Sequence, residues 1–451
     1  MTSGVIWKQL LEFSVPMAIG LLFQQLYNTV DAVVVGQYVG KEALAAVGST
    51  GSIVNMMVGL CAGLSVGASV IISQRYGAHD DAGVQDAVST TITVTFILCV
   101  LATAAGVFIV DPMLDLMATP QDVYASAHEY LTIYFYGMTG LLIYNIGSGV
   151  LRAVGDSTRP LYFLCFSAAL NVFFDLLFVI RYHLGIAGVA YATILSEFLS
   201  ALLVLIVLTR TKASYGIRWK HLMIDRDTLG KVLSIGFPSG IQQAITSFSN
   251  VFVQSYINYF GSACMAGWSS YNKLDVFILI PVQSIALAST TFVGQNYGAG
   301  KMARAKDGVK QAMYMSLAFT AALSILMEFT ARPMVMLFST EEDVVAYGVR
   351  FLSLISPFYV TVCFNQIYAG AMRGIGNART PMIIMLFSFV VFRQIYLYVN
   401  KLLGGAFIPV AVAYPVGWVV CSLLMTIYYR KSLLCHPEAG PAPAHEAEAN
   451  Y

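Results

Sequence analysis

The chain has 451 residues, of which 58% are hydrophobic and only 11% are charged, whereas soluble domains carry about 25% charged residues. This composition excludes a soluble protein. The 25 Lys and Arg residues nearly balance the 24 Asp and Glu residues, which excludes the clustered positive charge of a nucleic-acid-binding surface. The seven cysteines lie mostly in apolar runs, so we expect no disulfide framework and no structural metal site.

Long apolar segments recur along the whole chain. A helix that crosses a bilayer needs about 20 predominantly apolar residues. The sequence therefore predicts an all-α membrane protein. Twelve spans are expected, at residues 10–37, 50–74, 88–110, 130–151, 160–181, 186–208, 232–257, 270–292, 311–331, 351–372, 380–401 and 408–429.

The basic residues are distributed unequally between the predicted loops. With a cytoplasmic N-terminus, 18 of the 25 Lys and Arg residues lie on the inner side. This asymmetry follows the positive-inside rule, so we expect a multi-pass protein of the cell membrane with both termini in the cytoplasm. Residues 432–451 are rich in Pro, Ala and Glu and are expected to form a disordered cytoplasmic tail. The predicted outer loops contain only five basic residues: Lys41, Arg181, Arg332, Arg350 and Lys401.

Two motifs repeat at an offset of 221 residues. The segment QRYGA from Gln74 recurs as QNYGA from Gln295. The segment GVLRAVGDSTRP from Gly149 recurs as GAMRGIGNARTP from Gly370. Chance does not keep one register over two distant motifs, so the chain contains an internal repeat.

The repeat reaches the first span of each half with a one-residue slip, because Pro16 matches Pro238 and Asn28 matches Asn250 at an offset of 222. Two homologous halves of six spans follow. Because six is even, both halves have the same orientation and should be related by a pseudo-two-fold axis along the membrane normal. The expected division is an N-terminal half at 1–208, a basic cytoplasmic linker at 209–231 and a C-terminal half at 232–431.

The second repeated motif has a local structural interpretation. Its glycine would end one helix, its arginine would lie at the inner headgroups, and its proline would begin the next helix. An inner-gate contact between the halves is the alternative. The residues concerned are Arg152, Gly155 and Pro160, and their repeats Arg373, Gly376 and Pro381.

The twelve spans and the two repeated motifs together resemble the multidrug and toxin extrusion (MATE) transporters, over nearly the whole chain up to Lys431. The resemblance implies a secondary transporter, and no enzyme, that exports cationic or amphipathic organic compounds against an inward H+ or Na+ gradient. It implies no cofactor beyond the coupling ion, and we expect a monomer that contacts small organic substrates and lipid. The sequence looks most like the DinF-type bacterial and archaeal branch.

A carboxylate at bilayer depth is costly and usually functional, and five acids lie within the predicted spans: Asp31, Asp175, Glu197, Asp275 and Glu328. Two of them, Asp31 and Asp175, suggest a cation site. Asp31 ends a polar stripe on span one, and Asp175 follows Asn171 by one turn on span five. With a rise of about 1.5 Å per residue from the predicted outer end of each span, Asp31, Asp175 and Thr193 are expected about 9–10 Å below the outer end. Asn171 is expected about 15 Å below it. These oxygen ligands suit a hard cation or a shared proton; a polar contact between helices is the alternative.

The resemblance assigns the same four positions, Asp31, Asn171, Asp175 and Thr193, to cation coupling. Another branch of the family carries acids on spans seven and ten, where this chain has none. We therefore expect coupling to belong to the N-terminal half.

Other polar residues within the spans are predicted to line the substrate cavity. They follow helical spacing on spans one and seven. They are Gln24, Tyr27 and Asn28, and Gln243, Ser247, Asn250 and Gln254.

Four further charged residues lie within the C-terminal spans. Asp275 on span eight is expected to form a structural ion pair with Arg393 on span eleven or with Lys273. Glu328 lies near the outer end of span nine and is expected to anchor at the interface.

Three other functions fit the sequence less well. A lipid-linked oligosaccharide flippase of the same superfamily would need a strongly cationic cavity, for which only Lys273 and Arg393 are available. An ion channel is disfavoured because two unequal halves in one chain suit alternating access better than a symmetric pore. An intramembrane metalloenzyme is disfavoured because all six histidines fall in predicted loops or in the tail.

Overall fold

The structure is a computed structural model that describes residues 1–117 and 119–435. The described chain consists of helices and short connections and contains no strand. The helical assignment made from apolar length is therefore confirmed. Most of the predicted tail, residues 436–451, lies outside the described residues.

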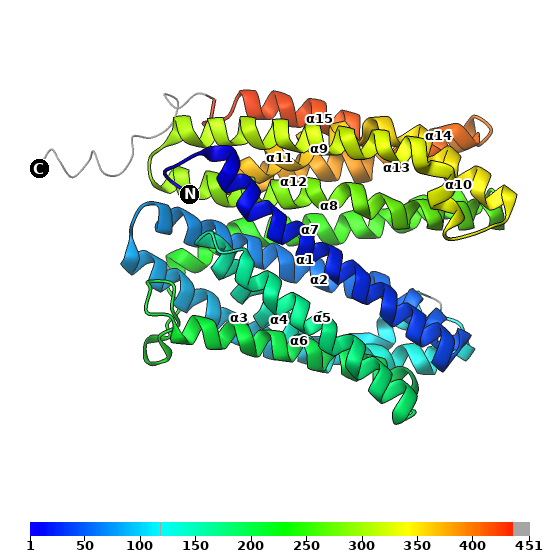
Figure 1. The fold of residues 1–451 in the computed structure, drawn as a ribbon, viewed down its shortest axis with the longest axis horizontal. Coiled ribbons are helices and arrows are strands. Elements are labelled where there is room, and N and C mark those ends of the chain that lie inside the picture. Colours follow the sequence, from blue (N-terminus) through cyan, green and yellow to red (C-terminus); the bar gives the residue numbers. More distant parts are fainter. Residues whose placement is uncertain (118, 436–451) are drawn as a thin grey trace, which may run out of the picture. The chain divides into compact units, whose positions relative to one another are not determined.

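Helices cover the predicted N-terminal spans in chain order (Figure 1). Two of them continue as π-helical turns, η1 after α1 and η2 after α5. The elements are α1 (Ile6–Val34), η1 (Val35–Val39), α2 (Lys41–Gly77), α3 (Asp81–Leu116), α4 (Gln121–Ala153), α5 (Thr158–Asp175), η2 (Leu176–Arg181) and α6 (Gly185–Arg210).

The remaining helices cover the predicted C-terminal spans, and three of those spans are divided into shorter elements. A short 3-10 helix, η3 (Trp219–His221), precedes them. The elements are α7 (Arg226–Asn258), α8 (Ser262–Gly298), α9 (Met302–Met336), α10 (Glu342–Ile355), η4 (Ser356–Phe358), α11 (Tyr359–Gly374), α12 (Arg379–Leu386), η5 (Phe387–Phe392), α13 (Arg393–Leu402), α14 (Phe407–Ala411) and α15 (Ala413–Arg430).

Nine helical stretches of the described chain are long and apolar enough to cross a membrane. The predicted spans at 130–151, 232–257 and 408–429 are also helical, as α4, α7 and α14 with α15, but are not among these nine. The structure thus supports a multi-pass membrane protein.

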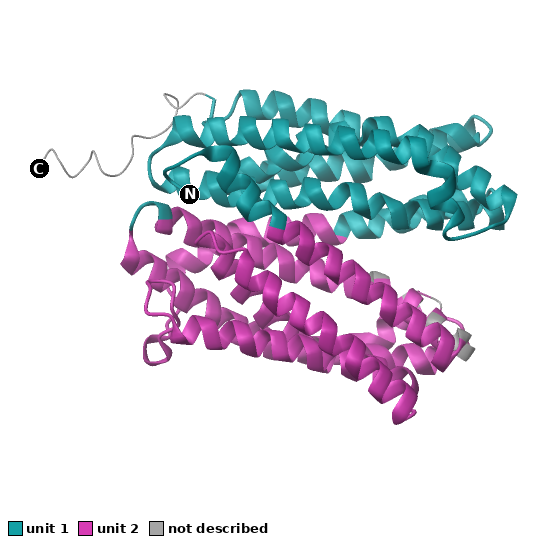
Figure 2. Cartoon of the chain, in the orientation of Figure 1, with its two compact units in different colours: residues 1–15, 77–79, 245–451 teal, residues 16–76, 80–244 magenta. Residues whose placement is uncertain are grey.

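The chain divides into two compact units, which Figure 2 shows in different colours. Unit 1 comprises residues 1–15, 77–79 and 245–451, and unit 2 comprises residues 16–76 and 80–244. In unit 2, α4 packs against α3 and α6, and α5 packs against α6. In unit 1, α8 packs against α9, α10 and α11. The boundary between the units falls inside α7.

Glycines allow α2 and the first part of α7 to pack closely within unit 2. A Cβ on Gly63 would lie 2.2 Å from the backbone nitrogen of Gly240, and a Cβ on Gly67 would lie 2.4 Å from the carbonyl oxygen of Val232. Small residues permit such backbone contact between membrane helices. Larger side chains at Gly63 or Gly67 are incompatible with this packing.

The connection between α6 and α7 is held against α3. The hydroxyl of Ser89 accepts a hydrogen bond from the backbone N–H of Met223 at 2.8 Å and donates to the carbonyl of His221 at 3.0 Å. The Thr90 hydroxyl accepts from the backbone N–H of Asp225 at 3.0 Å. The Asp225 carboxylate then caps α7 by accepting from the backbone N–H of Thr228 at 3.0 Å. Much of the predicted linker is therefore ordered.

The repeated arginine–glycine–proline motif forms the same turn in both copies. Gly155 and Gly376 have φ angles of +95° and +93°, which L side chains rarely adopt. Their backbone N–H groups donate to the carbonyls of Arg152 and Arg373, at 3.0 and 2.9 Å. Pro160 and Pro381 lie in the first turns of α5 and α12, as expected of the proline. The place of the arginines at the inner headgroups stays a prediction.

Candidate cation site and the adjoining pocket

The structure brings Asp31 and Asp175 together within unit 2. Asp31 lies one turn before the end of α1, and Asp175 is the last residue of α5. Their carboxyl groups are close enough for a hydrogen bond to form between them. Such a bond requires a proton on one of the two, because two ionised carboxylates only accept hydrogen bonds.

A π-helical turn directly follows Asp175, and another begins four residues after Asp31. In a π-helix the backbone bonds skip one residue more than in an α-helix, and such turns are frequent at functional sites. The two helices that carry the carboxyl pair therefore share an uncommon backbone feature beside it. Nothing in the hydrophobic pattern of the sequence predicts this feature.

The polar atoms around the pair are buried and lack donors. Among the described residues, no N–H or O–H group donates to either oxygen of Asp175 or to Oδ1 of Asp31. The amide of Asn171, whose residue is 1% exposed, also has neither a donor nor an acceptor partner. Buried polar atoms are rarely left unpaired, so this cluster is suited to a ligand that supplies positive charge or a proton.

Thr193 is the fourth residue of the predicted set, and its place beside the carboxyl pair stays a prediction. It is buried on α6, and its hydroxyl donates to the carbonyl of Val189 at 3.1 Å, which leaves oxygen lone pairs free to accept. Carboxylate, amide and hydroxyl oxygens are ligands that hard cations prefer. No cluster of three His, Cys, Asp or Glu side chains suited to a metal ion occurs in the described part of the chain.

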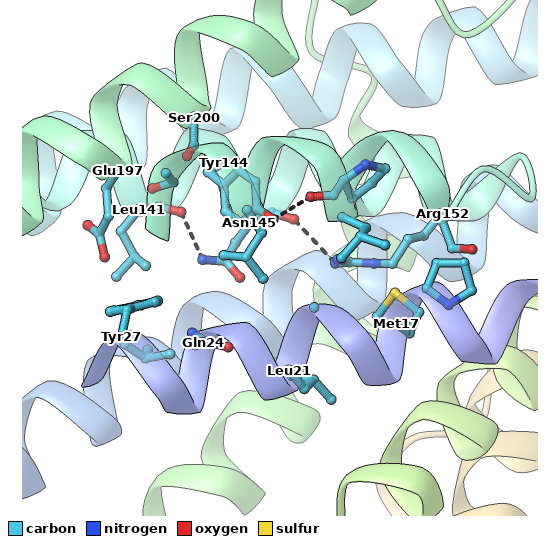
Figure 3. A pocket seen from close by; sticks show the side chains of 18 residues that line it. Met17, Leu21, Gln24, Tyr27, Leu141, Tyr144, Asn145, Arg152, Glu197 and Ser200 are labelled. Atoms are coloured by element: carbon cyan, nitrogen blue, oxygen red, sulfur yellow. Dashed lines mark hydrogen bonds between the residues drawn. The ribbon is translucent and has the colours of Figure 1, made fainter. Parts of the chain in front are cut away.

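A pocket of about 130 Å³ lies one helical turn from this site, between α1, α4, α5 and α6. Gln24 and Tyr27 of the predicted stripe on α1 line it, whereas Asn28 does not and is exposed. Figure 3 shows Glu197 and Arg152 toward opposite ends of the pocket, with Tyr144 and Asn145 between them.

The sequence marks Glu197 as an acid within a span but predicts no site for it, and it predicts no site for the α4 residues of this pocket apart from Arg152. The available signal was the position of Glu197 one turn after Thr193 on α6. The packing of α6 against α4, which brings Tyr144 and Asn145 to the same pocket, could not be predicted from the sequence.

The predicted stripe on α7 is dispersed among different contacts. Asn250 accepts a hydrogen bond from the Arg393 guanidinium at 2.8 Å, and Gln254 donates to Asn258 at 2.8 Å. Gln243 is exposed and Ser247 is half-buried. The assignment of these residues to substrate stays a prediction.

The expected ion pair between Asp275 and Arg393 is not formed in the described structure. Asp275 instead accepts hydrogen bonds from the hydroxyls of Tyr271, at 3.1 Å, and Tyr359. The Arg393 guanidinium lies 4.6 Å from the ring centroid of Tyr414 and donates to Ser249 at 3.0 Å as well as to Asn250. Both charges are satisfied by neutral partners, which removes the need for the pair.

Lys273 and Glu328 also have other partners. The Lys273 ammonium lies 5.1 Å from the ring centroid of Phe338. Glu328 is exposed and accepts a hydrogen bond from Ser356 at 2.9 Å, as suits an anchor near a helix end.

Known proteins match this chain both in fold and in two segments of its sequence. Residues 16–177 and residues 238–399 each match the model of the MatE family. The chain belongs to the MatE family of multidrug and toxin extrusion transporters. The two matched segments begin 222 residues apart, as Pro16 and Pro238 do. As a MatE protein it is a multidrug efflux transporter and not an enzyme.

Individual MatE relatives match over nearly the whole chain. The probable multidrug resistance protein YoeA of Bacillus subtilis is 28% identical over 440 residues, which cover 94% of each chain. The probable multidrug resistance protein YpnP of the same organism is 29% identical, over 87% of this chain and 88% of that protein. A solved structure of a MOP superfamily transporter from Pyrococcus furiosus superposes with a TM-score of 0.90 and 25% identity, covering 96% and 97% of the two chains.

These relatives support small organic compounds as the transported substrates and give no support to the flippase alternative.

Proposed function

We propose that this protein is a cation-coupled antiporter of the DinF-type branch that exports cationic or amphipathic organic compounds by alternating access. It would reside as a monomer in the cell membrane with both termini in the cytoplasm. Its twelve spans would form two parallel six-helix halves, at 1–208 and 232–431, joined by the linker at 209–231. The observation that carries the coupling proposal is the pair of buried carboxyl groups of Asp31 and Asp175.

In the proposed cycle, the pair exists in two charge states. A proton shared by Asp31 and Asp175, or a Na+ ion between them, removes the repulsion of two carboxylates in a buried position. Asn171 and Thr193 would supply neutral oxygen ligands to the ion. A change of charge at a buried site stabilises the inward- and outward-facing states differently, and this difference links ion entry to substrate release.

Transport by the purified protein in proteoliposomes tests this proposal. An inward H+ gradient without Na+ and a Na+ gradient without a pH gradient are imposed separately, and the counter-movement of a fluorescent organic cation is followed. We expect one of the two gradients to drive transport, which identifies the coupling ion. Gradient-independent uptake in both arms would contradict an antiporter, and unchanged gradient dependence in Asp31→Asn would contradict the proposed site.

A further inference from the structure

The pocket beside the cation site contains an acid that the proposed coupling mechanism does not use. Glu197 lines the pocket from α6. Among the described residues, its carboxylate accepts no hydrogen bond and forms no ion pair, and Asp31 is one of its electrostatic neighbours. A structural acid within a membrane protein normally has a hydrogen-bonding or charged partner. Glu197 therefore lacks the partner that a purely structural role requires.

Glu197 is also separate from the carboxyl pair. The described chain contains no cluster of three acids close enough to hold one ion, so Glu197 does not complete the site of Asp31 and Asp175. Its backbone is fixed by the packing of α6 on α4, because a Cβ on Gly140 would lie only 3.1 Å from the carbonyl carbon of Glu197. The acid thus has a fixed place at the pocket and is free to face a ligand there.

Two tyrosines, Tyr27 and Tyr134, interact electrostatically with this acid. Tyr27 and Tyr144 line the same pocket, and Figure 3 shows Glu197 extending from α6 toward Tyr27 on α1. A carboxylate among aromatic rings is the chemistry that binds quaternary ammonium groups, since the ring faces attract cations and tolerate their methyl groups.

The opposite end of the pocket has the opposite charge. Arg152 lines it there, and its guanidinium donates to the hydroxyl of Ser65 at 3.2 Å. Leu141, at the Glu197 end, and Arg152 are eleven residues apart on α4, which corresponds to about 16 Å along the helix. The two charges are too far apart to form an ion pair. A positively charged group that enters the pocket is therefore attracted to the Glu197 end and repelled from the Arg152 end.

From these observations we infer that Glu197 is a specificity-determining residue that binds the quaternary ammonium head of an exported compound. The cavity of about 130 Å³ is smaller than the roughly 300–1,000 Å³ of drug-sized sites, so it accepts a head group while the rest of the compound lies outside. The inference rests on the proposed function. It adds that one acid recognises the charge of the substrate and that other acids bind the coupling ion.

Two isosteric probes test the inference by binding to the purified full-length protein. (3-Hydroxyphenyl)trimethylammonium carries the positive head, and 3-tert-butylphenol has the same shape without charge. The measured quantity is the ratio of the two dissociation constants, because this ratio does not depend on the fraction of correctly folded protein. We expect the unmodified protein to prefer the cation by about tenfold or more.

Glu197→Gln should abolish this preference, and Glu197→Asp should retain part of it. Glu328→Gln, which removes a different acid of the membrane region, serves as the matched control and should leave the ratio unchanged. An unchanged ratio in Glu197→Gln, or the absence of any preference in the unmodified protein, would overturn the inference.

Asp31→Asn separates this inference from the proposed function. It should lose ion-driven transport but keep the preference for the cation. Loss of the preference in Asp31→Asn with its retention in Glu197→Gln would assign charge recognition to the coupling pair and reject the role of Glu197. Gradient-driven transport by a protein with no cation preference would reject the role of Glu197 alone. A cation preference that depends on Glu197 in a protein without gradient-driven transport would contradict the antiporter alone.

Discussion

The carboxyl group of Asp31, on α1, lies within hydrogen-bonding range of the carboxyl group of Asp175, at the end of α5. No other described group donates a hydrogen bond to Asp175. One positive charge added at this pair would remove the repulsion between two carboxylates.

Asp31→Asn is expected to abolish ion-driven export while leaving folding and some substrate binding intact. Asparagine has nearly the same shape and can still donate to Asp175, but it cannot change its charge. Export in cells and ligand binding to the purified variant are the measurements. Full export by Asp31→Asn would remove the proposed mechanism.

Asp175→Asn should have the same effect as Asp31→Asn. Because the two groups act as one titrating unit, the loss in the double variant should be much smaller than the sum of the two single losses on a free-energy scale. Transport rates of the single and double variants, measured under one imposed gradient, provide the comparison. Additive losses would show that the two carboxyl groups act independently.

The orientation of the chain can be tested by cysteine labelling. Lys220→Cys, at an exposed position of the linker, should react with an impermeant maleimide only from the cytoplasm. Gln121→Cys, at the start of α4, should react only from outside. The unmodified protein measures the background from the native cysteines. The reverse pattern would contradict the topology derived from the Lys and Arg distribution.

Asn250→Ala is expected to lower stability and to change which compounds are exported. It removes the acceptor of the Arg393 guanidinium, and a hydrogen bond to a charged group contributes about 1.5–3 kcal/mol. Gln243→Ala, at an exposed position on the same helix, should change the export range with little effect on stability. Thermal unfolding and export of a compound panel measure both effects. Loss of ion dependence in either variant would contradict coupling by the N-terminal half.

Gly155→Ala should destabilise the protein by about 1–2 kcal/mol, because an L side chain at φ +95° is strained. Gly376→Ala, with φ +93°, should behave alike. Gly230→Ala is the matched control, since Gly230 lies within α7 and an added Cβ meets no atom there within 4 Å. The control should be neutral or slightly stabilising. Equal apparent melting temperatures in all three variants would show that the turns carry no strain.

The contribution of Asp225 to the stability of the folded protein should depend on pH. Hydrogen bonds from the hydroxyl and the backbone N–H of Thr228 hold the pKa of Asp225 below its ordinary value, and Arg75 adds to the effect. A lowered pKa means that the stabilisation is complete above the unfolded-state pKa of about 3.9 and is lost as the pH falls through the lower folded-state value.

Asp225→Asn should therefore melt at a lower temperature than the unmodified protein at pH 6, and the difference should shrink toward pH 3. Asp227→Asn, which removes an exposed ion pair with Lys231, should have a small effect. A difference that is constant across this pH range would exclude the carboxylate of Asp225 as its source.

Much of the helical architecture could be predicted from the sequence because long apolar runs between charges are a direct requirement of the bilayer. The proximity of Asp31 and Asp175 was also predictable, since helical rise alone gave both residues similar depths. The hydrogen-bond partners of Asp275 were not predictable, because they are Tyr271, one turn away, and Tyr359, on a different helix. Hydrogen bonds from hydroxyl groups to a carboxylate cannot be recognised from the pattern of charged residues.

The π-helical turn of residues Val35–Val39 has a consequence for the history of the two halves. A π turn holds one residue more than an α turn closed at the same point. The offset between the repeats falls from 222 at Asn28 to 221 at Gln74, so the N-terminal copy contains one additional residue in the interval where this turn lies. In the other copy, α7 remains α-helical to Asn258. A one-residue difference in length between the two copies, located beside Asp31 in the N-terminal one, accounts for both the change of offset and the widened turn.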